Sequence, residues 1–183
     1  MNPEQWWYWN DLFNKKQIKN LHKICKKTKT PSFVDSPAEK VTKTSNVSGI
    51  YWKSVQPYLQ DFHERIKITN TLQCGYNIYD LSDYDFVLFN KYDSQNKAQY
   101  EWHRDGSNSF VNDFKFTVLI NLSLEKYEGG HLHLFNQGPQ HIKNLDKAGS
   151  AIMFKSAINH KITPVTKGIR HSMSLFIKGP RFI

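Results

Sequence analysis

The sequence predicts a mainly β fold with helices confined to its N-terminal third, an α+β arrangement built on a sandwich or barrel. After Asn70, short apolar runs alternate with turn residues up to the end of the chain. Before Asn70, two stretches repeat apolar residues every three or four positions. Many short strands joined by turns are typical of such β structures, and helices gathered at one end of the chain would cover one outer face.

The chain length and composition favour one domain. With 183 residues, 39% of them hydrophobic and 14% aromatic, the chain is long enough for one substantial core. We therefore expect residues 1–183 to form a single domain, in which residues 1–69 supply helical support and a linker and residues 70–183 form the β core.

The two expected helices span residues 11–29 and 52–69, because apolar residues at spacings of three and four share one helical face. Their apolar stripes are Leu12, Phe13, Ile18, Leu21, Ile24 and Cys25 in the first helix, and Val55, Leu59, Phe62 and Ile66 in the second. Residues 30–49 contain Pro, Gly, Ser, Thr and Lys without a period, so we expect a loop or extended linker there. The run Trp6 to Trp9 is interpreted as a plug in the core or at a sheet edge, with an exposed binding surface as the alternative.

The expected strands follow from alternating or continuous apolar runs bounded by turn residues. They span residues 75–80, 85–92, 98–103, 115–122, 131–135, 141–143, 151–154, 161–165 and 172–178. Glycines at 106, 129, 130, 138, 149 and 168 mark turns between them.

Charge, cysteines and hydropathy exclude several classes of protein. The net charge is +9, but seven lysines fall between Lys15 and Lys29 without an acid, which is typical of a solvated helix face and argues against a nucleic-acid partner. The two cysteines, Cys25 and Cys74, are far apart and suggest reduced thiols. No run reaches the roughly 20 apolar residues of a membrane span, and the aromatic start is unlike a signal peptide. We therefore expect a cytoplasmic protein without a membrane partner.

The strongest chemical signal is the run Glu101 to Asp105. His103 and Asp105 are two positions apart, so on a strand both side chains point to the same face. His160, at the start of another expected strand, is a candidate third ligand. Two histidines and one carboxylate leave positions open on a divalent ion, which suits non-haem Fe(II). Each of these residues alone is a weak signal.

Arg170 adds to this pattern, ten residues beyond His160. Only four of the 25 basic residues are arginines, and the planar guanidinium matches a carboxylate with two hydrogen bonds. Ser172 lies on the same face of the last expected strand, so both residues can reach one carboxylate.

Residues 70–178 resemble the Fe(II)- and 2-oxoglutarate-dependent dioxygenases, and most closely their prolyl 4-hydroxylase-like group. The matching segments, in chain order, are Asp85 to Tyr92, Tyr100 to Asp105, Leu119 to Ser123, Tyr127 to Leu132, Gly149 to Phe154, and His160 to Arg170 continuing through Phe176. They cover more than half of the chain.

The resemblance implies a double-stranded β-helix, a cupin-like jelly-roll core, with iron bound by His103, Asp105 and His160. It implies that 2-oxoglutarate chelates the iron while Arg170 holds its far carboxylate, that O₂ is the second cosubstrate, and that ascorbate supports activity. Other expected cosubstrate-binding residues are Tyr92, Ser172, and Thr117 or Leu119. For Tyr92, a structural position at a barrel corner stays open as the alternative.

The resemblance further implies hydroxylation of a prolyl residue in a peptide or protein, with release of succinate and CO₂. Tyr100, Trp102, Arg104 and the loop at residues 30–49 are the expected substrate wall.

Two other functions stay open. One is a 2-oxoglutarate oxygenase acting on a free amino acid, another side chain or nucleic acid, although Phe176 stands where the demethylases usually have a further arginine. The other is a non-catalytic jelly-roll binding module, which the presence of all three ligands and Arg170 argues against. His131 and His133 form a rival metal pair, but we expect them outside the barrel, with Leu132 and Leu134 inside.

Overall fold

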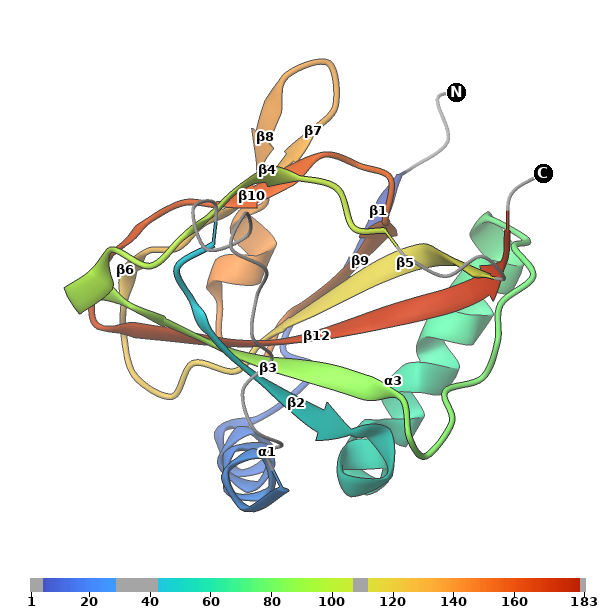
Figure 1. Ribbon diagram of the computed structural model, residues 1–183, viewed down its shortest axis with the longest axis horizontal. Coiled ribbons are helices and arrows are strands. Elements are labelled where there is room, and N and C mark those ends of the chain that lie inside the picture. Colours follow the sequence, from blue (N-terminus) through green and yellow to red (C-terminus); the bar gives the residue numbers. More distant parts are fainter. Residues whose placement is uncertain (1–4, 29–42, 107–111, 182–183) are drawn as a thin grey trace.

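The computed structural model of the protein describes residues 5–28, 43–106 and 112–181. These residues form three layers: two helices, a six-stranded sheet and a smaller four-stranded sheet (Figure 1). Neighbouring strands in both sheets are antiparallel, and many neighbours are far apart in the sequence. This interleaving brings distant chemical groups together between the sheets.

The larger sheet has the order β1-β9-β5-β12-β3-β2. Its strands are β1 (Trp6–Trp9), β9 (Ala151–Lys155), β5 (Asn112–Asn121), β12 (Ile169–Pro180), β3 (Phe86–Asp93) and β2 (Asn46–Tyr51). Its two long central strands, β5 and β12, pair over nine residues from Asn112↔Pro180 to Asn121↔Ser172, with one register shift.

The smaller sheet has the order β4-β10-β7-β8. Its strands are β4 (Tyr100–His103), β10 (His160–Ile162), β7 (Leu132–Phe135) and β8 (Pro139–His141). A separate pair joins β6 (Glu128–Gly129) to β11 (Val165–Lys167), and two short 3-10 helices complete the description, η1 (Ser94–Asn96) and η2 (Lys143–Asp146).

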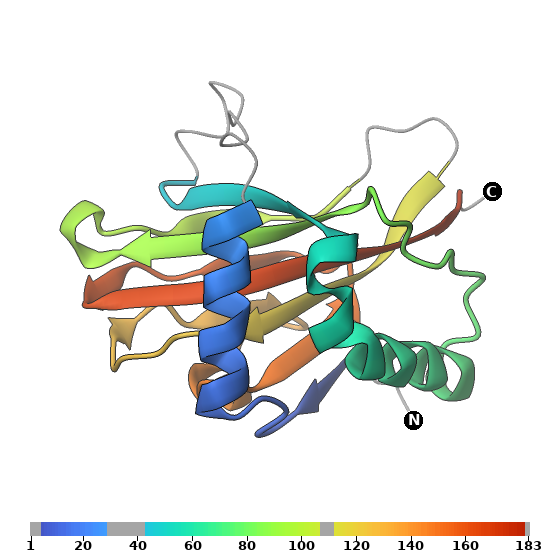
Figure 2. The ribbon, with the colours of Figure 1, turned by 90° about the horizontal axis from the view of Figure 1, so that it is seen from below.

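Two helices, α1 (Lys15–Thr28) and α3 (Trp52–Gln73), lie on the same side of the larger sheet, as Figure 2 shows. The start of α1 is a reciprocal cap: Asn14 Oδ1 accepts from the backbone N–H of Lys16 and Gln17, and Gln17 Oε1 accepts from the backbone N–H of Asn14. Ile18, Leu21 and Cys25 of α1 are buried, as the apolar spacing predicts.

The larger sheet separates two apolar clusters, because side chains alternate along each strand. On β9, Ala151 and Met153 pack with the helices, whereas Ile152 and Phe154 pack toward the smaller sheet. Leu132 and Leu134 of β7 belong to this second cluster and are at most 1% exposed. The expectation that these leucines point inward is therefore confirmed.

The structure differs from the sequence prediction mainly in the first 80 residues. Residues 1–69 supply strands as well as helices: β1 and β2 are the two edge strands of the larger sheet, and β2 includes part of the expected linker at 30–49. Residues 29–42 lie outside the described residues. β1 pairs with β9 and β2 pairs with β3. These strands therefore depend on partners that are distant in the sequence, and a short local pattern of residues does not reveal them.

Three later segments also differ. Residues 75–80 are not a strand; the side chain of Asn70 holds this segment by bonding both the backbone N–H and the carbonyl of Tyr76. The expected strand 161–165 is divided between β10 and β11, and the expected strand 141–143 is replaced by β8, which ends at His141. Thr163 and Pro164 belong to neither strand and interrupt a pattern that the sequence analysis treats as one continuous strand.

Both cysteines are free thiols, as expected. Burial raises the pKa of Cys25 to about 12, so this thiol is protonated and unreactive. Within the described residues, no helix has the length and hydropathy to cross a membrane.

Two histidines packed between α1 and the larger sheet make stability depend on pH. The rings of His22 and His171 lie 4.7 Å apart, and His171 also stacks on Phe89. The pKa of His171 is lowered to about 4, chiefly by burial and also by His22 and nearby lysines. Burial also lowers the pKa of His22. The unfolded chain binds protons on histidine near pH 6.5, where the folded chain does not. Folding stability is therefore complete above about pH 6.5 and is lost as the pH falls toward 4.

We expect the free energy of unfolding, measured by urea denaturation, to fall steadily between about pH 6.5 and about pH 4. His171→Phe keeps an aromatic ring against Phe89 and removes the titrating group, so its stability should decline less over the same range. Equal slopes for the two proteins would contradict this assignment.

Candidate metal centre and adjoining cavity

Strand pairing brings His103 and His160 together. His103 ends β4, His160 begins β10, and the two residues are direct partners in the antiparallel register. Asp105 follows β4, and its backbone N–H donates to the carbonyl of Ser156 at 3.2 Å. The β4–β10 pairing and this backbone hydrogen bond thus bring Asp105 close to His160, although 55 positions separate them in the sequence.

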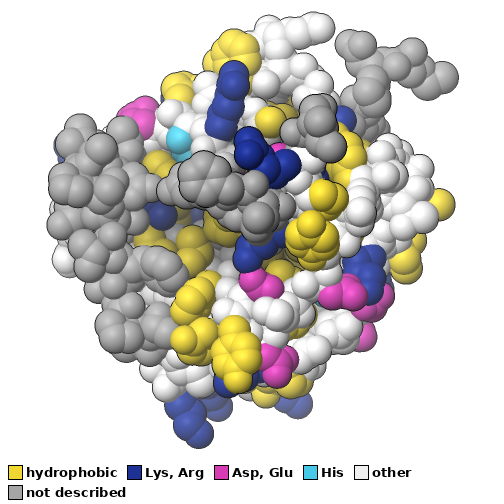
Figure 3. Space-filling view, turned by 45° about the vertical axis from the view of Figure 1, so that its right-hand side comes forward, with side chains coloured by type: hydrophobic (Ala, Val, Ile, Leu, Met, Phe, Trp, Pro, Cys, Tyr) yellow, Lys and Arg dark blue, Asp and Glu magenta, His cyan; other side chains and the backbone are white. Residues whose placement is uncertain are grey.

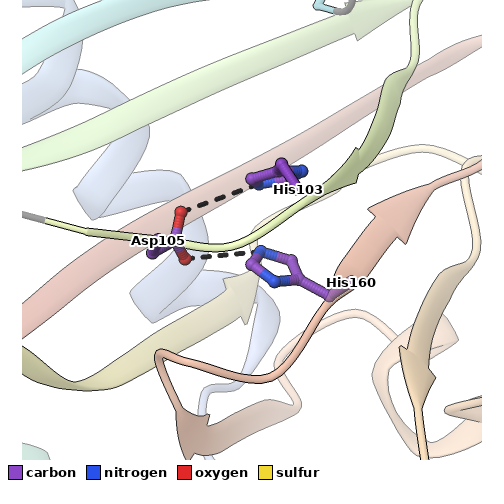
Figure 4. Close-up of side chains that lie close together, drawn as sticks. All are labelled: His103, Asp105 and His160. Atoms are coloured by element: carbon purple, nitrogen blue, oxygen red, sulfur yellow. Dashed lines mark ion pairs between the residues drawn. The ribbon is translucent and has the colours of Figure 1, made fainter.

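The three side chains converge at one point between the sheets (Figure 4). Nε2 of His103 lies 3.6 Å from Oδ1 of Asp105, and Nε2 of His160 lies 3.3 Å from Oδ2. Donors at about 2.0–2.2 Å from one divalent ion lie about 3 Å apart when they are adjacent. Two imidazole nitrogens and one carboxylate at this spacing fit a divalent transition metal with open positions for other ligands.

Both imidazoles have the ring orientation of a metal ligand. Nδ1 of His103 bonds the carbonyl of Glu101 at 2.7 Å, and Nδ1 of His160 bonds the carbonyl of Ile158 at 3.0 Å. A carbonyl only accepts, so Nδ1 carries the proton in each ring and Nε2 faces the shared centre. Such outer hydrogen bonds fix the tautomer and orientation of ligating histidines.

The pKa shifts of His103 and Asp105 favour the protonation states that bind a cation. The pKa of His103 is lowered to about 4, chiefly by burial and also by His160, while Asp105 opposes the shift. Burial raises the pKa of Asp105, but the adjoining His160 imidazole, the hydrogen bond donated by Thr117 and the nearby His103 outweigh it, so the pKa is lowered overall. A neutral imidazole and an ionised carboxylate are the ligand forms that metals bind.

Thr117 supports the carboxylate from β5. Its Oγ1 donates to Asp105 Oδ2 at 2.6 Å, which leaves Oδ1 toward His103. Ser156 Oγ lies 3.0 Å from Thr117 Oγ1 and must be the donor there, because the Thr117 proton is already engaged. Sequence analysis placed Thr117 or Leu119 in the cosubstrate pocket; both line the cavity, and Thr117 touches the metal end of it.

A bulge in the β4–β10 pairing determines which aromatic residues of β4 reach the site. Between the pairs His160↔His103 and Ile162↔Tyr100, β4 has one more residue than β10. Tyr100 therefore lies on the His103 side, and the two rings stack with centroids 3.4 Å apart. Trp102 packs on Phe135 and under the Lys161 ammonium instead, away from the cavity lining. Of the three expected wall residues, Tyr100 and Arg104 line the cavity and Trp102 does not.

The three candidate ligands open into a cavity of about 530 Å³. Arg170 lines the same cavity and is 1% exposed. Its Nη1 donates to Ser172 Oγ at 3.1 Å, and its guanidinium carbon lies 5.3 Å from the ring centre of Tyr92, its partner across β12 and β3. No carboxylate of the described residues pairs with Arg170, and its buried Nε has no hydrogen-bond partner among them. A buried guanidinium with unused donors fits an incoming carboxylate.

Gly130 leaves room for the Arg170 side chain. A Cβ at Gly130 would lie 2.8 Å from Cδ of Arg170 and 2.9 Å from Cγ2 of Val165, and the backbone there has φ +63°. The pair Gly129-Gly130 thus does more than turn the chain into β7, because its second glycine adjoins the arginine stem.

Several residues of the cavity lining were not among the predicted site residues, and three of them carry polar groups near the proposed ligand positions. Asn90 and Ser174 are hydrogen-bonded at 3.1 Å beside Arg170 and Ser172, and Lys43 lies over the Tyr100 ring at 4.9 Å. Asn90 lies two positions before Tyr92 and Ser174 two after Ser172, so strand alternation alone would have found both. Lys43, in the expected loop, had no such signal.

One face of the molecule has a mixed surface. On the face shown in Figure 3, Lys and Arg side chains lie among hydrophobic and acidic ones instead of forming one continuous basic field. Electrostatic attraction of a nucleic-acid backbone depends on such a field. This face therefore gives no support to the nucleic-acid alternative.

Comparison with known proteins agrees with this chemistry. Residues 87–178 match the model of the 2OG-Fe(II) oxygenase superfamily. The PKHD-type hydroxylase YbiX of Escherichia coli O1:K1 / APEC is 32% identical over 97 residues, which are 50% of this chain and 42% of that protein. The chain thus spans less than half the length of this relative.

Solved structures share the fold at low identity. A prolyl-4-hydroxylase of Pseudomonas putida has a TM-score of 0.72 at 16% identity, covering 97% of this chain and 94% of that one. A prolyl hydroxylase from Trichoplax adhaerens, in complex with a hypoxia inducible factor peptide fragment, has a TM-score of 0.70 at 16% identity, covering 96% and 84%. Because the superfamily model spans half of the chain, from β3 to β12, and contains every residue of the cavity's metal and arginine ends, this protein belongs to the 2OG-Fe(II) oxygenase superfamily.

Proposed function

We propose that the protein is an Fe(II)- and 2-oxoglutarate-dependent dioxygenase that hydroxylates a prolyl residue in a peptide or protein. The observation that carries the proposal is one cavity with a two-histidine, one-carboxylate cluster and a buried arginine without an acidic partner among the described residues. The β sandwich around this cavity is, in our proposal, the double-stranded β-helix of the superfamily, formed by residues 1–183 as one domain.

In this proposal, His103, Asp105 and His160 hold the iron, and Arg170 and Ser172 hold the far carboxylate of 2-oxoglutarate. Tyr92 and Leu119 border the cosubstrate, and O₂ is the second cosubstrate. When bound, the iron and 2-oxoglutarate supply the oxidising power: decarboxylation of the cosubstrate gives succinate and CO₂, and the substrate C–H gains a hydroxyl group.

The chain's own residues orient these groups. The Nδ1–H groups of both histidines stay on backbone carbonyls, which keeps each Nε2 aimed at the centre. Thr117, itself bonded to Ser156, holds Asp105 Oδ2. Arg170 supplies positive charge without acting as an acid, because guanidinium does not lose a proton in proteins. The apolar cluster of Leu132, Ile152 and Phe154 also contains Tyr92, Leu119 and Ile162, which line the cavity.

The prolyl assignment is supported by the fold shared with prolyl hydroxylases and by the open mouth of the cavity beside Tyr100, Arg104 and Lys43. An aromatic ring and two cationic side chains suit an extended peptide, whose backbone carbonyls accept hydrogen bonds. Ascorbate is expected to sustain turnover, and the cytoplasm is the proposed location.

We expect the purified protein, with Fe(II), ascorbate and 2-oxoglutarate, to form succinate and add one oxygen atom to proline-rich peptides, as measured by mass spectrometry. His160→Ala removes one of three ligands and should abolish both products. His133→Phe, which alters a histidine on the outer face of β7, should leave them unchanged. Turnover only with free amino acids or nucleic acid would refute the peptide assignment and leave the iron chemistry intact.

Arg170→Lys should raise the 2-oxoglutarate concentration needed for half-maximal rate by about 10- to 100-fold, because a point charge replaces a two-pronged contact. At saturating 2-oxoglutarate, the maximal rate should be largely retained. An unchanged requirement would show that Arg170 does not anchor the cosubstrate.

Gly130→Ala should also raise the 2-oxoglutarate requirement, because the new methyl group displaces the Arg170 stem. Gly75→Ala is the matched control: its φ of +65° imposes the same backbone cost, about 1–2 kcal/mol, but nothing lies within 4 Å of the new Cβ. Both variants should lose thermal stability, and only Gly130→Ala should change the cosubstrate requirement. Equal kinetic effects would contradict the role of Gly130.

A further inference from the structure

A second cluster of metal-binding side chains lies outside the cavity. His131, His141 and Asp146 place one ligand atom each within 4.8 Å of one another, the same donor set as the inner centre. Nδ1 of His131 lies 3.0 Å from Oδ1 of Asp146, and Nε2 of His141 lies 2.8 Å from Oδ2. One carboxylate therefore faces an imidazole with each of its oxygens.

We propose that His131, His141 and Asp146 form a second divalent-metal site, a zinc site, that clamps β7, β8 and η2 together. This proposal does not depend on the proposed enzymatic function. Zinc accepts imidazole nitrogen and carboxylate oxygen, and three protein ligands plus water complete its tetrahedral shell.

The backbone holds each of the three residues in place before any ion binds. His131 is pinned to Thr163: its N–H donates to the Thr163 hydroxyl, and its carbonyl accepts from the Thr163 N–H. His141 lies on β8, opposite His133 of β7. The carbonyl of Asp146 accepts from the Asn121 amide at 3.2 Å. Fixed ligands of this kind lose little conformational entropy on binding a metal.

The side chains are partly exposed and can shift by small amounts when an ion binds. They are 39%, 29% and 31% exposed for His131, His141 and Asp146, so water reaches the site. Ligands at about 2.0–2.1 Å from a tetrahedral zinc ion lie about 3.4 Å apart. The observed separations of 2.8 and 3.0 Å, each to a different oxygen of Asp146, are a few tenths of an ångström shorter, and all three ligand atoms lie within 4.8 Å of one another.

The surroundings favour zinc over the iron chemistry of the cavity. The outer cluster lies on the face of the smaller sheet opposite to Leu132 and Leu134, and none of its three ligands lines the cavity of Arg170. An ion there takes water as its remaining ligand. For the same ligands, divalent zinc binds more tightly than ferrous iron.

His133 provides a matched control in the same cluster. Its ring stacks on His141 with centroids 5.2 Å apart, and it is not among the three ligands. His133→Phe keeps the stacking surface and removes the imidazole nitrogens, so it tests the packing of the cluster separately from its ligands.

The test uses the full chain with His103→Ala and His160→Ala, which leaves the inner centre a single ligand. After chelation of bound metal, equilibrium dialysis against Zn²⁺ should show one equivalent bound. Asp146→Asn and His141→Gln should each weaken binding by more than about 100-fold, above the loss typical of outer-shell partners, whereas His133→Phe should leave it unchanged. Co²⁺ should give the visible absorption of a tetrahedral ion only where the three ligands are intact.

Thermal unfolding gives a second measurement. Zn²⁺ should raise the melting temperature of the background protein and of His133→Phe, but not of Asp146→Asn or His141→Gln, because only a bound ion stabilises the native state. Circular dichroism of each metal-free variant checks that it is folded. Absence of a bound equivalent, equal binding in all variants, or a loss of stability without any response to Zn²⁺ would mean a hydrogen-bonded triad only, and would overturn the proposal.

Discussion

The direct pairing of His103 with His160 across β4 and β10 is the constraint on which the rest of the site depends. The two imidazoles reach the same centre only because the strands that carry them are neighbours, and Asp105 is added by its backbone bond to the segment before β10. The antiparallel register also sets the reach of Arg170, since β12 passes beside β3 and β5 in the facing sheet. A small number of strand pairings thus determines the distance between the metal end and the arginine end of the cavity.

At the arginine end of the cavity, burial of the Arg170 guanidinium carries an unfavourable desolvation free energy. A guanidinium that is 1% exposed has lost most of its water, and within the described residues it gains one hydroxyl, the face of Tyr92 and no carboxylate. Such a group favours an anionic ligand over a neutral one, because the attraction to a negative charge compensates for the hydration that the guanidinium has lost. The polar residues Asn90 and Ser174 continue this lining, so the cavity wall changes from apolar to polar along β3 and β12.

The proximity of the site residues was largely predictable, whereas parts of the fold were not. His103, Asp105, His160 and Arg170 occur at spacings that resemble a known family, and strand alternation found Ser172. The strands β1 and β2 were missed because edge strands depend on partners far away in sequence, and residues 75–80 were overpredicted because the Asn70 side chain replaces a strand ladder. Ser156 supports Asp105 through Thr117, yet nothing in its sequence surroundings indicates this; only the pairing of β5 with β9 brings it there. Trp102 is adjacent to His103 and so points to the opposite face, whereas the bulge brings Tyr100 to the His103 side.

That bulge has a consequence for how the strand can vary. Substitutions between Tyr100 and His103 leave the phase of the pleat intact, so the imidazole keeps its direction. Deleting one residue there would remove the bulge and leave the two end pairs two residues apart in both strands, so Tyr100 and His103 would share one face by regular alternation. The extra residue therefore changes the pairing of this short strand with β10 while leaving Tyr100 and His103 on one face.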